Sequence, residues 1–170
     1  MRSTAPYSTL QISLHWATVV ALVVQVWTSP AIARTHHAVH LGNAVEAYDI
    51  VLHNIHAVVG GLAFLFAATR LLLRWRFPPT PSPSLSGWQE RAALIVHYGL
   101  YAVLLALPLT GFVRMYFLSV AGPIHIGLTR ALYVLLFIHI AAALWHGLVR
   151  RDDVISRMGL NFLRQKDRVL

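Results

Sequence analysis

The chain contains no cysteine and little charge. None of its 170 residues is cysteine and only 12% are charged, whereas 57% are hydrophobic. Without cysteine there can be no disulfide, thiolate nucleophile or cysteine-ligated iron–sulfur or zinc site, so any metal must be bound through nitrogen or oxygen. Soluble domains carry about 25% charged residues. The shortage of charge therefore indicates a membrane protein.

Four long segments also lack every charged residue. A bilayer-spanning helix needs roughly 20 mostly apolar residues. The uncharged runs contain 31, 20, 22 and 19 residues and cover positions 3–33, 50–69, 92–113 and 131–149. We predict an all-α membrane protein that forms one domain over residues 1–170, with no separate soluble catalytic domain. The four transmembrane helices are expected at approximately 10–31, 50–75, 88–117 and 123–149, followed by a basic tail at 150–170.

The basic residues are divided unevenly between the two sides of such a bundle. If the N-terminus is cytoplasmic, eleven of the fourteen basic residues lie on the cytoplasmic side and only Arg34, Arg114 and Arg130 lie on the other. Cytoplasmic loops carry the excess of lysine and arginine, so both termini are predicted to be cytoplasmic. This distribution accounts for the net charge of +8 and excludes nucleic acid as a necessary partner.

The connections between the helices differ in composition. Four prolines in residues 77–87 predict an extended inner loop, and Pro108 predicts a kink in the third helix. Residues 36–49 are predicted to form an outer loop. It contains His36, His37 and His40, which are interpreted as solvated side chains rather than as ligands for copper or zinc. The tail is similarly interpreted as a solvated end rather than a membrane-surface helix.

Histidine is the most informative residue type in the chain. Ionisable groups within membrane spans are costly and commonly functional, although a single histidine is more often a packed, hydrogen-bonded residue. Six of the ten histidines lie within or at the ends of the predicted spans: His15, His56, His97, His125, His139 and His146. So many at similar depths favour a function.

Two of these histidines share a face of the fourth helix. His125 and His139 are fourteen residues apart, which separates them by about 21 Å along the axis and by about 40° around it. The alternation of helix direction places His56 at the depth of His125 and His15 at the depth of His139. Facing imidazoles of this kind hold b-type haem in helix bundles. The sequence therefore predicts an outer pair, His56 and His125, and an inner pair, His15 and His139.

Small residues lie about one turn from three of these histidines. Gly60 follows His56, and three others follow the histidines of the fourth helix: Thr129, Ala142 and Ala143. They would leave space for a flat ring, but close packing of helices explains them equally well.

Several motifs together resemble a known family. The first is the segment from Leu10 to Trp16, which contains His15, and the second is Ile55-His56, followed by Gly60 and by the Arg70 to Arg74 segment at the end of the second helix. The third is Ala106-Leu107-Pro108 with Gly111, and the fourth is Ile124-His125 with His139 fourteen residues later. In order and spacing, over nearly the whole chain, these resemble the bacterial cytochrome b561 family. The resemblance implies a four-helix inner-membrane bundle with two b haems, ligated at the outer site by His56 and His125 and at the inner site by His15 and His139.

The resemblance also implies a reaction. One branch of the family oxidises periplasmic superoxide to oxygen and passes the electron to ubiquinone. Related cytochrome b subunits feed quinone from a partner hydrogenase or formate dehydrogenase. Superoxide is the preferred donor for this chain, and the partner-enzyme anchor is the first alternative. A haem-free, proton-coupled transporter that uses the same histidines is an alternative of another class.

Four further residues are candidates for binding at these sites. His97 and His146 lie toward the cytoplasmic end, where either could hydrogen-bond a quinone carbonyl or a haem propionate, or simply pack. They could also form a haem pair in place of the inner pair above. Arg114 and Arg130 lie near the outer face, where we expect propionate binding, with snorkelling to the interface as the alternative.

Overall fold

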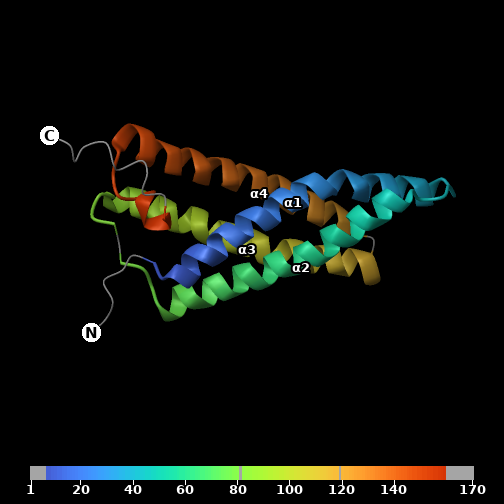
Figure 1. Cartoon of the computed structure of the whole chain (residues 1–170), viewed down its shortest axis with the longest axis horizontal. Helices are drawn as coiled ribbons and strands as arrows, with labels where there is room; N and C mark the ends of the chain where they lie inside the picture. The colour runs from blue at the N-terminus through green and yellow to red at the C-terminus, as the bar shows by residue number, and fades with distance from the viewer. Residues whose placement is uncertain (1–6, 81, 119, 160–170) are drawn as a thin grey trace.

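The protein is a bundle of four long helices (Figure 1). A computed structural model describes residues 7–80, 82–118 and 120–159. The predictions made above for the first residues and for the tail beyond Gly159 lie outside the described residues. The helices are α1 (Thr9–His40), α2 (Ala47–Arg76), α3 (Gly87–Tyr116) and α4 (Ala121–Leu144), followed by a π-helical turn η1 (Trp145–Arg150) and a 3-10 turn η2 (Ser156–Met158).

Each of the four helices is long and apolar enough to cross a membrane, and the described residues contain no strand. The predicted all-helical membrane fold is thus confirmed. The helices alternate in direction, so α1 begins and η1 ends on the same side of the bundle (Figure 1). We call this side the near end. The opposite side, where α1 is joined to α2 and α3 to α4, is the far end.

The first helix is longer than predicted. α1 continues through Pro30 to His40, so the three histidines assigned to an outer loop lie in its last turns. Proline at position 30 cannot donate a backbone hydrogen bond to the carbonyl of Val26. The hydroxyl of Ser29 donates to that carbonyl instead, at 3.0 Å, which removes part of the cost of continuing the helix.

An ion pair fastens the far end of α1 to α2. The guanidinium of Arg34 donates through Nε and Nη2 to both carboxylate oxygens of Asp49, at 2.6 to 3.1 Å. A bidentate pair fixes orientation as well as distance. It stabilises a helical hairpin that extends beyond the far ends of α3 and α4 (Figure 1). Arg34, one of the three basic residues expected on this side, is thus paired with an acidic residue.

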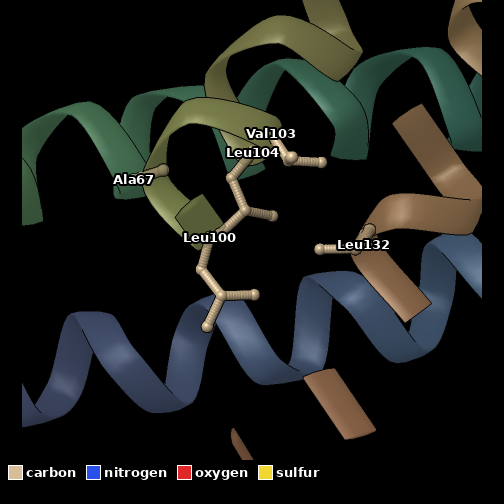
Figure 2. Close-up of a cluster of buried hydrophobic side chains, with 5 residues drawn as sticks. All are labelled: Ala67, Leu100, Val103, Leu104 and Leu132. Carbon is tan, nitrogen blue, oxygen red and sulfur yellow. The ribbon is translucent and has the colours of Figure 1, made fainter. Parts of the chain in front are cut away.

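An aliphatic cluster fills the middle of the bundle (Figure 2). Ala67 of α2, Leu132 of α4 and three residues of α3 form it: Leu100, Val103 and Leu104. Leu132 is seven residues from His125 and seven from His139. The apolar layer therefore lies midway between the two levels at which paired histidines were predicted.

A folded-back segment covers the near end. After η1 the backbone turns at Arg151, whose φ of 50° is left-handed. Residues of this segment then bond to distant parts of the chain: Asp153 accepts from Ser82 and Ser84 at 2.7 and 2.6 Å, and the carbonyl of Met158 accepts from Trp16 Nε1 at 3.1 Å. The proline-rich loop and the segment after η1 are thus joined.

The carboxylate of Asp153 makes this attachment pH-dependent. Partial burial raises its pKa, but the hydrogen bonds from Ser84 and Ser82, together with the charge of Arg157 and a backbone hydrogen bond, outweigh burial and hold the pKa below its usual range. The stabilisation is therefore fully present above the unfolded pKa of about 3.9 and is lost as pH falls through the lower folded value.

We expect Asp153→Asn to raise hydrogen exchange in residues 151–159 at pH 7. Equal exchange in the variant and the unchanged protein would contradict this attachment.

Candidate functional site

Three imidazoles converge in the near half of the bundle. His15 of α1, His97 of α3 and His139 of α4 come together there, with ring centres 6.3 Å apart for His15 and His139 and 5.2 Å apart for His97 and His139. His15 and His139 were predicted as a pair. His97 joins them, which places all three at one depth.

The spacing of His15 and His139 suits two axial ligands of one iron. Two metal–imidazole bonds of about 2.0 Å, with about 1.1 Å from each nitrogen to its ring centre, would separate the rings by about 6.2 Å. The observed 6.3 Å agrees with this value, whereas the 5.2 Å between His97 and His139 is too short. Helices α1 and α4 are also not among the closely packed pairs, which are α1 with α2, α2 with α3 and α3 with α4.

In the far half, His56 is oriented by hydrogen bonds from α1. The hydroxyl of Thr28, itself fully buried, lies 2.8 Å from the carbonyl of Val24 and 3.0 Å from Nδ1 of His56. Because the hydroxyl proton is donated to Val24, the hydroxyl oxygen accepts from Nδ1. The other ring nitrogen, Nε2, then carries no proton. Gln25 also holds the backbone of α2 here, since its amide donates to the carbonyl of His56 at 2.8 Å.

His125 is oriented in the same way by α3. Its Nδ1 donates to the carbonyl of Leu107 at 3.0 Å and lies 3.1 Å from the hydroxyl of Thr110. That hydroxyl donates to the carbonyls of Ala106 and Leu107, so it too can only accept from the ring. Metal-bound histidines have this arrangement, with Nδ1 donating to an oxygen and Nε2 free for the metal.

The two far-half histidines are close enough to interact. The charge that His125 would carry acts on His56. Each presents an Nε2 without a proton, which is the donor atom that haem iron takes from histidine. In the near half, Nδ1 of His15 is buried without a hydrogen-bond partner among the described residues. The nitrogen donors at both levels fit haem, the far pair with its supporting oxygens and the near pair by spacing.

One glycine permits the close approach of α3 to His125. A Cβ at Gly111 would lie 3.3 Å from Cε1 of the ring, whereas a Cβ at Gly61 would meet nothing within 4 Å. We expect Gly111→Val to displace the imidazole and to destabilise the protein by about 1–3 kcal/mol, as overpacking does. Thermal unfolding in detergent measures this loss, with Gly61→Val as the control. Similar melting temperatures for the two variants would contradict the contact.

The small residues predicted to leave space for a ring have other neighbours. A Cβ at Gly60 would lie 3.3 Å from Nε2 of Gln25, so this glycine accommodates the amide that bonds to His56. Thr129 donates to the carbonyl of His125 at 2.9 Å. At Gly60 the structure therefore shows packing of α1 against α2, the alternative reading of the sequence, whereas the hydroxyl of Thr129 bonds within its own helix.

The other predicted site residues are more dispersed. His146 lies in η1 and donates from Nδ1 to Asp152 at 2.6 Å, so it belongs to the folded-back segment and not to the group around His97. The guanidinium of Arg114 lies over Gly122, where a Cβ would be 3.2 Å away, and its charge acts on His125. Arg130 is exposed.

The histidines at the end of α1 form no three-ligand site. The ring of His36 lies 5.9 Å from that of His53, and the hydroxyl of Thr35 lies 3.0 Å from Nδ1 of His53. Within the described ranges no three histidine, aspartate or glutamate side chains come together as metal ligands.

Sequence reasoning missed the residues that orient the far-half imidazoles. Gln25, Thr28 and Thr110 are polar residues within apolar spans, and that was their only signal. Threonines are common in membrane helices because their hydroxyl bonds to the preceding turn, so the partners of the imidazoles emerged only from the structure.

Comparison with known proteins agrees with this architecture. The chain is 27% identical to the probable superoxide oxidase CybB of Yersinia pestis, over 89% of this chain and 94% of that protein. It is 25% identical to cytochrome b561 homolog 1 of Escherichia coli, over 89% of this chain and 96% of the relative. The sequence model of the prokaryotic cytochrome b561 family matches residues 6–160. The chain therefore belongs to the prokaryotic cytochrome b561 family of membrane electron-transfer proteins.

Proposed function

We propose that the protein transfers electrons across the bacterial inner membrane through two b haems, from a periplasmic donor to ubiquinone. The main support is the orientation of His56 and His125, because the hydroxyls of Thr28 and Thr110 and the carbonyl of Leu107 hold Nδ1 of the two rings and leave Nε2 free. A haem-free proton relay would have no need to hold both rings in one protonation form. When bound, each haem supplies one-electron chemistry at its iron.

The residues of the two levels have separate roles in this proposal. His56 and His125 hold the iron at the far level, and Arg114, whose charge acts on His125, binds a propionate there. Arg130 is also a candidate for that role, although its exposure makes snorkelling the simpler explanation. His15 and His139 hold the iron at the near level, where their 6.3 Å spacing supports the assignment.

The orientation in the membrane follows from the basic residues. We place the near end in the cytoplasm, because the arginines in the last two turns of α2, Arg91 near the start of α3 and the arginines that follow α4 lie on that side. The far end then faces the periplasm, with Arg34 neutralised by Asp49 and Arg114 and Arg130 as its other arginines. Glu46 is a second acidic residue of this side, so the fixed charge of the far end is only +1 and its attraction for an anion is weak.

Superoxide is the proposed donor. The relative from Yersinia pestis is named a probable superoxide oxidase and aligns over most of both chains. At the near end, His146 and His97 are candidates to bind a quinone carbonyl or a propionate. His146 also has Asp152 as a hydrogen-bond partner, and such a pair can hold and release the proton that quinone reduction consumes.

The test is purification in detergent followed by oxidised and dithionite-reduced spectra, with haem measured per chain as the pyridine haemochrome. We expect two b haems per chain, and then superoxide-dependent quinone reduction by stopped flow. A protein that stays colourless with added haem would contradict the proposal and favour proton-coupled transport. Two haems with turnover only in the presence of a copurified dehydrogenase would indicate an anchor subunit.

A further inference from the structure

Two arginines of α2 lie over tyrosines of α3 in the near half of the bundle. Arg70 and Arg74 are four residues apart and therefore share a face of α2. The guanidinium carbon of Arg70 lies 5.8 Å from the ring centre of Tyr101, and that of Arg74 lies 5.8 Å from the ring centre of Tyr98. Tyr101 is buried, with 7% of its surface exposed, whereas Tyr98 is 53% exposed. Arg70 therefore lies over a ring inside the bundle, and Arg74 over a ring nearer its surface.

These two cations have no acidic partner in the part of the chain that the structure describes. The ion pairs found there join Arg34 to Asp49, and join His146 and Arg150 to Asp152. Like charges four residues apart on a helix repel each other, and an ionised side chain within a membrane span is costly unless it is paired. Tyrosine rings attract the guanidinium groups but do not neutralise them.

The arginines also lie near the near-half histidine group. α1, α3 and α4 each contribute an imidazole to it, and α2 contributes none. The charge of Arg70 acts on all three rings: His15, His97 and His139. That of Arg74 acts on His97. Two guanidinium groups without an acidic partner among the described residues thus lie near the place where the near-half iron is proposed.

From this placement we propose that Arg70 and Arg74 bind the two propionate carboxylates of the near-half haem. The inference rests on the proposed function. Each guanidinium presents a planar fork of donors that matches a carboxylate, and two forks on one helix face suit two carboxylates on one ring edge. Arginines that only snorkel would extend toward the interface, whereas Arg70 lies over the buried ring of Tyr101 and Arg74 lies one turn away on the same face of α2.

The test compares Arg70→Gln and Arg74→Gln with Arg76→Gln, which removes the same charge from an exposed position at the end of α2. Haem content and the midpoint potential of each haem are measured in the purified protein. Loss of a cation from a propionate disfavours the added electron, so we expect both test variants to keep two haems. Their near-half reduction equilibrium should fall about tenfold, or about 59 mV for one electron. The midpoint potential of the far-half haem should be unchanged in these variants, and both potentials should be unchanged in the Arg76→Gln protein.

Arg70→Lys is the control for a folding defect in Arg70→Gln. It retains the charge and should keep the near-half potential close to that of the unchanged protein. An unchanged near-half potential in both glutamine variants would overturn the inference, as would an equal shift in Arg76→Gln. Loss of copurified anionic lipid without a change in potential would show that the arginines bind headgroups instead. Absence of haem from the unchanged protein would contradict the proposed function itself.

Discussion

Replacing His125 by alanine is expected to halve the haem content, from two haems per chain to one. The ring is held by the carbonyl of Leu107 and the hydroxyl of Thr110, and the described structure offers no other imidazole of α4 at that depth. Removing it leaves His56 as the single ligand of the far-half iron, which a bundle cannot retain well. Pyridine haemochrome and reduced spectra measure the loss, and His56→Ala should give the same residual spectrum.

The control for this experiment is His37→Ala, which removes an exposed histidine near the end of α1 and should retain both haems. Thr110→Val is a milder test, since it removes one acceptor of the ring and leaves the carbonyl. We expect it to retain haem with a shifted potential, because partners of the ligand tune the metal. A His125→Ala protein with two haems would show that the far-half iron is bound elsewhere.

The second large effect distinguishes His139 from His97. His139→Ala should remove the near-half haem, because its ring is the one that lies 6.3 Å from His15. His97→Ala should retain both haems, because a ring centre 5.2 Å from that of His139 is too close for both to bind one iron from opposite sides. The haem count and the number of components in a redox titration measure both outcomes.

His15→Ala is the matched variant for this comparison. It should lose the same haem as His139→Ala, leaving only the far-half component. If His97→Ala lost a haem and His15→Ala did not, then His97 would be the ligand and the near-half pair would have to be reassigned.

The spans and the meeting of distant histidines could be predicted because they depend on simple quantities. Runs without charge give the length of a membrane helix, and fourteen residues bring a helix back nearly to the same face. These two facts, with alternating direction, were enough to bring His15 to His139, which the structure places 6.3 Å apart. The family resemblance rested on the same residues.

The rest depends on contacts that no spacing rule contains. The hydroxyl of Ser29 compensates for Pro30, and the helix ends at His40, nine residues after the predicted end at residue 31. The amide of Gln25 occupies the space beside Gly60, and the π-helical turn η1 directs His146 to Asp152. Each depends on a hydrogen bond or a close contact between two particular side chains or backbone groups, and neither residue of such a pair is unusual in the sequence.

The aliphatic layer around Leu132 also acts as an electrical insulator. Its side chains carry no group that could pass a proton, so under the proposed function an electron that crossed it would travel without a compensating positive charge. Fourteen residues of helix are about 21 Å of a core about 30 Å thick. About two-thirds of the membrane potential therefore acts on each electron, or about 1.6 kcal/mol per 100 mV. With the near end in a negative cytoplasm, an energised membrane would oppose the proposed reaction more than tenfold at equilibrium, making quinone reduction sensitive to the voltage of the cell.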